Sequence, residues 1–155
     1  MKLSRNFYLS EFTSSATATR LNLPNSPNKE QLINIQFLID NVLQVVRNKI
    51  GPIRITSGFR SPALCEAIGS NGKTSQHTKG QAADIQFHKR GIMNNKLLMD
   101  TIIEHCDFDQ LINEFDYSWI HVSYKCTGNR KQILNAYKDN NKTRYTELTH
   151  YYKSL

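Results

Sequence analysis

The segment that most constrains this chain is residues 75–85, where His77 and Asp84 stand seven positions apart on either side of Gly80. On one helix, these side chains would lie two turns, or roughly 10 Å, apart and could not share an ion. A turn at Gly80 that leads into a strand over residues 82–87 would bring them together. The spacing therefore predicts a turn followed by a strand.

Residues 82–87 alternate as a half-buried strand would. Ala83, Ile85 and Phe87 share one face, and Asp84 points to the other. A lone carboxylate among small and apolar residues needs a partner, and the strongest partners are a cation or a metal. We therefore predict that His77 and Asp84 are two ligands of one zinc ion.

Residues 118–124 supply a candidate third ligand. They also alternate as a strand, with His121 on the face opposite Ile120 and Val122. Two histidines and one aspartate leave a fourth zinc position open, which is typical of a catalytic site rather than a cysteine-rich structural one. The open position admits a water that the metal can make nucleophilic. Each histidine alone is more simply an ordinary imidazole, and only the combination favours a metal.

These motifs resemble the zinc D-Ala-D-Ala carboxypeptidase and endopeptidase family, which cleaves peptidoglycan stem peptides and includes many phage endolysins. The likeness rests on Ser75-x-His77-x-x-Gly80-x-Ala82-x-Asp84 followed by residues 119–123. Residues 55–62 resemble the family's serine, aromatic, arginine segment, and residues 7–12 resemble the opening of one branch. The resemblance covers residues 7–125 and implies the hedgehog/DD-peptidase fold, an α+β fold with a small antiparallel sheet flanked by helices.

A zinc peptidase also needs a carboxylate near the metal to take and return a proton. Many relatives carry an acidic residue three places before the second zinc histidine, but here that position is Ser118. A hairpin that turns at residues 116–117 would place Glu114 opposite Trp119, on the face of His121. We therefore predict Glu114 as the general base and Asp116 as the second candidate. A solvated charge or an ion pair is the alternative for Glu114.

Three further residues are candidates for contact with the substrate. Arg60 can bind a substrate carboxylate or stabilise an oxyanion, because the guanidinium matches either; a structural ion pair is its alternative role. Ser75 is expected either to bind the substrate or to cap its own turn. Trp119 is expected to pack beside the metal site.

Composition fits one small globular enzyme. With 155 residues, 39% hydrophobic and 21% charged, the chain is long enough for one domain and not for two. A net charge of +7 suits an anionic partner such as a bacterial wall, a nucleic acid or a membrane surface. Among these we expect peptidoglycan rather than nucleic acid. Residues 126–155 form a basic extension in which residues 132–137 and 143–148 are expected to pair as a hairpin. This hairpin could cover the sheet or bind the wall, but a solvated edge is the simpler expectation.

The remaining features concern the cell compartment. Cys65, Cys106 and Cys126 are too few and too scattered for a disulfide framework or a cysteine zinc site, and they are expected to be buried. No segment has the length of a membrane span, and the start lacks the apolar stretch of a signal peptide. We expect synthesis in the cytoplasm, release by lysis, and a monomer.

Several helices are expected around this site. The clearest covers residues 27–50, with Ser26 as its cap and Pro27 as its first residue. A short one, capped by Ser10 or Ser14, would run through Thr19. Others are expected over 62–68 and 96–106, with a strand over 53–56 and a polar connection over 88–95.

The sequence as a whole predicts a hydrolase in which His77, Asp84 and His121 hold one zinc ion and a peptide bond of a peptidoglycan stem is cut. The rival hypothesis is a non-catalytic cell-wall-binding or phage structural protein that keeps the same fold.

Overall fold

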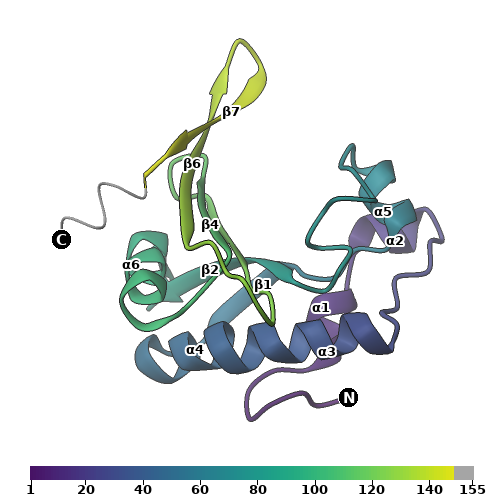
Figure 1. Ribbon diagram of the computed structural model, residues 1–155, viewed down its shortest axis with the longest axis horizontal. Coiled ribbons are helices and arrows are strands. Elements are labelled where there is room, and N and C mark those ends of the chain that lie inside the picture. The colour runs from purple at the N-terminus through teal and green to yellow at the C-terminus, as the bar shows by residue number, and fades with distance from the viewer. Residues whose placement is uncertain (149–155) are drawn as a thin grey trace.

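A seven-stranded sheet runs through the computed structural model, which describes residues 1–148 (Figure 1). Its order is β1-β2-β5-β4-β6-β7, with β3 paired to the end of β2. The strands are β1 (Ile53–Ser57), β2 (Ala82–Lys89), β3 (Ile92–Met93), β4 (Gln110–Glu114), β5 (Trp119–Ser123), β6 (Gln132–Asp139) and β7 (Lys142–Glu147). Helices flank this sheet, so the α+β prediction is confirmed.

The helices are α1 (Leu9–Thr13), α2 (Ala16–Arg20), α3 (Lys29–Leu38), the π-helical segment η1 (Ile39–Leu43), α4 (Gln44–Ile50), α5 (Pro62–Ala67) and α6 (Asn95–His105). Two longer helical stretches, α3–η1–α4 and α6, lie beside the sheet, and α1, α2 and α5 are short (Figure 1). None of the helices within residues 1–148 combines the length and the apolar character needed to cross a bilayer.

The long helix α3–η1–α4 begins at Lys29, two residues after the start that Ser26 and Pro27 predict. Asn28 caps it by accepting a hydrogen bond from the Gln31 backbone, while the Gln31 side chain accepts one from the Asn28 backbone. This reciprocal capping box satisfies two backbone donors, which Ser26 and Pro27 would not. The predicted start at Pro27 is therefore wrong, although the buried stripe of the helix lies where its spacing indicates.

Two other local predictions are also wrong. The segment before Thr19 forms two short helices rather than one, because Ser15 caps the second by accepting from the Ala18 backbone. Residues 88–95, expected only as a polar connection, contain strand structure: β2 continues to Lys89 and pairs with β3 across a tight turn.

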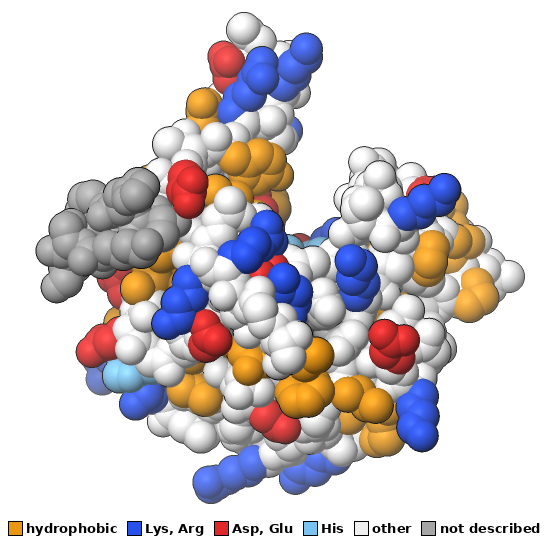
Figure 2. Space-filling model, viewed as in Figure 1, with side chains coloured by type: hydrophobic (Ala, Val, Ile, Leu, Met, Phe, Trp, Pro, Cys, Tyr) orange, Lys and Arg blue, Asp and Glu red, His pale blue; other side chains and the backbone are white. Residues whose placement is uncertain are grey.

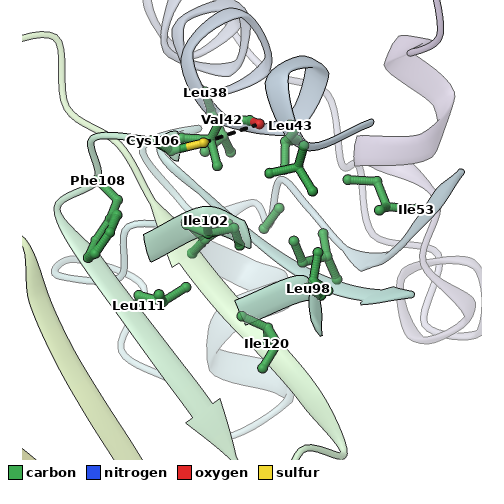
Figure 3. Close-up of a cluster of buried hydrophobic side chains, with 14 of the residues drawn as sticks. Leu38, Val42, Leu43, Ile53, Leu98, Ile102, Cys106, Phe108, Leu111 and Ile120 are labelled. Atoms are coloured by element: carbon green, nitrogen blue, oxygen red, sulfur yellow. Dashed lines mark hydrogen bonds between the residues drawn. The ribbon is translucent and has the colours of Figure 1, made fainter. Parts of the chain in front are cut away.

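The core lies between the long helix, α6 and one face of the sheet (Figure 3). Ile85 from β2 and Ile120 and Val122 from β5 are fully buried there, as their alternation predicted. The thiol of Cys106 lies 3.9 Å from the backbone oxygen of Val42 in the same cluster. Cys65 and Cys106 are buried free thiols, but Cys126 is exposed, which corrects the expectation for that residue.

The C-terminal strands extend the sheet instead of covering it. Since β5 already has β2 and β4 on its two sides, β6 crosses to the free edge of β4 and runs parallel to it. This pair is parallel, whereas the sheet that we expected is antiparallel. Strands β6 and β7 then form an antiparallel hairpin that projects from the body of the protein (Figure 1).

Candidate active site

His77, Asp84 and His121 meet on the face of the sheet opposite the core. One potential ligand atom from each lies within 4.8 Å of the other two. Asp84 Oδ1 is 3.4 Å from His77 Nε2 and 3.1 Å from His121 Nδ1. Asp84 and His121 are direct cross-strand partners in β2 and β5, whereas His77 comes from the loop before β2. Two strands and one loop thus bring together three side chains that are far apart in the sequence.

The His77 loop is held in place by its contact with α3. Gly80 has a φ of +74°, and a Cβ there would collide with the backbone carbonyl of Gln31. The Gln31 side chain also donates to the Thr78 carbonyl at 3.0 Å, and Asn34 donates to the Lys79 carbonyl at 2.9 Å. Only glycine tolerates both the left-handed backbone and this close approach.

The orientation of the His77 ring is fixed by a backbone carbonyl. Its Nδ1 lies 2.7 Å from the Gly58 oxygen and so donates its hydrogen there. His77 is only 4% exposed, and burial lowers its pKa despite the nearby charge of Asp84. In the tautomer that donates from Nδ1 to Gly58, the Nε2 lone pair is directed at Asp84 Oδ1. Two facing lone pairs repel unless a cation lies between them, so the donor set fits a divalent metal such as zinc.

The Asp84 carboxylate is shared between the histidines and Arg60. Burial by itself raises the pKa of Asp84, but the interactions of this carboxylate with His77 and His121 outweigh that effect and hold the pKa well below its usual range. Arg60 Nη2 donates to Asp84 Oδ2 at 2.9 Å, and Arg60 Nε donates to Ser57 Oγ at 2.9 Å. The ion pair that was the alternative for Arg60 is therefore present, and it turns Oδ1 toward the imidazoles.

The two candidate bases occupy different environments. Glu114 stands opposite Trp119 in the β4–β5 hairpin, in the predicted register, and lines the same cleft as His121. Burial raises the pKa of Glu114, with His121 opposing and Asp84 adding to the shift. Asp116 instead lies exposed in the turn, with a φ of +55°. Of the two, Glu114 is the one beside the histidine.

The other predicted substrate contacts also border the cleft, whose volume is about 590 Å³. Trp119 packs against Phe115, with 5.4 Å between the ring centroids. Ser75 Oγ accepts a hydrogen bond from the His77 backbone at 3.3 Å, so it caps the turn while it faces the cleft. Arg60 completes this group.

Sequence reasoning missed several residues that line the cleft. Asp109, just before β4, and Arg130, just before β6, both do so, and the motif pattern gave no signal for them beyond their charge. Tyr145 lies in a row across the sheet, opposite Ala136, which in turn lies beside Glu114. Pairing of the C-terminal hairpin with β4 creates this row, and no local pattern in the sequence indicates it.

Comparison with known proteins places the chain in a family. A family model described as Peptidase M15 matches residues 5–123, which is more than half of the chain. No curated protein matches the sequence closely enough to count as a relative. The matched range contains His77, Asp84 and His121 and nearly coincides with the range of the motifs. The chain therefore belongs to the Peptidase M15 family, as the resemblance predicted.

Proposed function

We propose that this protein is a zinc peptidase that hydrolyses peptide bonds in peptidoglycan stem peptides. The observation that carries the proposal is the His77–Asp84–His121 cluster at the base of an open cleft, with a neutral imidazole lone pair facing a carboxylate. A zinc ion bound there would supply Lewis-acid activation of a water molecule and of the substrate carbonyl.

The side chains around this site would supply proton transfer and substrate binding. Glu114 takes a proton from the attacking water and delivers it to the leaving amine; a pKa raised by burial suits a group that must both accept and return a proton. Arg60 fixes Asp84, and the N–H groups that Ser57 and Asp84 do not use can bind a substrate carboxylate or the developing oxyanion. Trp119 borders the bound peptide.

The choice of substrate rests on the family and on charge. The chain carries 20 Lys and Arg residues against 13 Asp and Glu, which favours binding to an anionic bacterial wall. The protein would reach this wall after lysis of the cell that makes it.

The experiment is release of peptide fragments from purified peptidoglycan, followed by mass spectrometry. Zinc-loaded protein should release new amino termini, and chelated protein should not. Glu114→Gln should retain zinc and release fragments far more slowly, while Glu66→Gln, which alters an exposed carboxylate on α5, should behave like the wild type. Wall binding without released fragments in the zinc-loaded wild type would instead support the non-catalytic rival.

A further inference from the structure

We propose that Lys125 and Arg130 form a subsite for a carboxylate of the peptide substrate, at the end of the cleft where β4 begins. The inference rests on the proposed peptidase function and specifies which substrates the same cleft accepts. Both residues line the cleft, and both follow residue 123, where the family match ends. The subsite therefore lies outside the segment that the family model matches, and it belongs to this chain rather than to the matched family segment.

A buried carboxylate holds the two cations in place. Asp109 is 0% exposed and accepts from Arg130 Nε at 3.0 Å and from Arg130 Nη2 at 2.8 Å. Lys125 Nζ lies 3.3 Å from the same carboxylate, and Gln76 Nε2 donates to it at 2.9 Å. Because Gln76 precedes His77, this cluster is joined directly to the loop that carries a proposed metal ligand.

The charges in this cluster do not cancel. The bidentate contact of Arg130 already neutralises Asp109, so Lys125 brings a surplus positive charge to the cleft. Both cations remain accessible, since the Lys125 side chain is 34% exposed and the Arg130 side chain 52%. Figure 2 shows Lys and Arg side chains gathered around the hollow between the β6–β7 hairpin and α5.

The backbone around Lys125 is also fixed, which separates this site from an ordinary solvated surface. The Asn129 side chain accepts from the Lys125 N–H and donates to the Lys125 carbonyl, both at 2.8 Å. The Arg130 N–H donates to Asp109 at 3.1 Å. Little backbone conformational entropy is therefore lost when an anion binds between the two cations.

The position of Lys125, two residues after the end of β5, sets the distance of the subsite from the cut bond. Lys125 lies four positions after His121, which in extended chain corresponds to about 13 Å. A peptide bound in the cleft would cover this distance with roughly three or four extended residues. We therefore assign the subsite to a carboxylate that lies several residues from the scissile bond, such as that of D-Glu in a stem peptide.

The test is a binding measurement with two peptides that differ by one charge. They are L-Ala-γ-D-Glu-L-Lys-D-Ala-D-Ala and its analogue in which the D-Glu α-carboxylate is an amide. Calorimetry with the zinc-loaded Glu114→Gln protein should give about tenfold tighter binding of the carboxylate form. This preference should shrink as salt is raised.

Lys125 variants decide whether the preference comes from this subsite. Lys125→Gln should bind both peptides about equally, and Lys125→Glu should prefer the amide. Lys142→Gln, an exposed cation in β7, should keep the wild-type preference. Equal affinity of the unaltered subsite for both peptides would overturn the proposal while leaving hydrolysis intact. Failure to bind either peptide would overturn both the subsite and the stem-peptide function.

Discussion

The two faces of the central sheet are built from neighbouring residues and have opposite requirements. In β2 and β5, Ile85 and Ile120 point into the core and are fully buried, while Asp84 and His121 point into the cleft. The core face needs only apolar side chains that fill the space, whereas the cleft face needs particular atoms at particular distances. Because side chains alternate along a strand with a period of two, a single pairing register decides which residues enter the core and which enter the cleft.

On the cleft face, removal of one proposed metal-coordinating side chain should abolish function. His77→Ala removes the Nε2 that faces Asp84, so stoichiometric zinc and hydrolysis should both be abolished. Metal analysis of the purified variant and a peptidoglycan release assay measure the two effects. His88→Ala, an exposed histidine near the end of β2, is the matched control. Retained hydrolysis without metal in the His77 variant would refute the ligand set.

Loss of the proposed base should separate metal binding from turnover. Glu114→Gln keeps the size of the side chain but cannot accept a proton, so kcat should fall by about 10²–10⁴-fold. Zinc content should stay at one ion. Asp116→Asn, in the exposed turn, should change kcat little, and the opposite ranking of the two variants would transfer the role to Asp116.

On the core face, a substitution should lower stability while metal binding is kept. Ile120→Ala leaves a cavity beneath the strands that carry Asp84 and His121, and it should lower the free energy of unfolding by about 2–5 kcal/mol. The folded fraction should still bind one zinc ion, because His121 remains on the other face. Urea denaturation combined with metal analysis tests this. Loss of zinc from fully folded protein would mean that the two faces are not separable.

The Asp109 cluster should make a smaller, pH-dependent contribution. Burial alone would raise the pKa of Asp109, but hydrogen bonds from Arg130 and Gln76 hold it well below its usual range. A depressed folded-state pKa stabilises the protein above the unfolded value of about 3.9, and this contribution disappears as pH falls below it. Asp109→Asn should therefore cost about 1–3 kcal/mol near neutral pH and progressively less in acid. An unfolding free-energy difference independent of pH would contradict this.

The two faces also differ in how far the sequence predicts them. Alternation in 82–87 and 118–124 correctly indicated which residues enter the core, and hairpin register placed Glu114 opposite Trp119. The Gly58 carbonyl that orients His77 and the Asp109 cluster depend on contacts between distant segments. The parallel β4–β6 pair has no local signal either, because it follows from which sheet edge remained free.

The central claim is that His77, Asp84 and His121 share one metal ion, and anomalous X-ray diffraction at the zinc edge tests it most directly. Crystals grown with zinc should give one strong peak about 2.0–2.2 Å from a nitrogen of each imidazole and an oxygen of Asp84. Absence of a peak among these side chains at saturating zinc would contradict the claim, as would one coordinated by other residues.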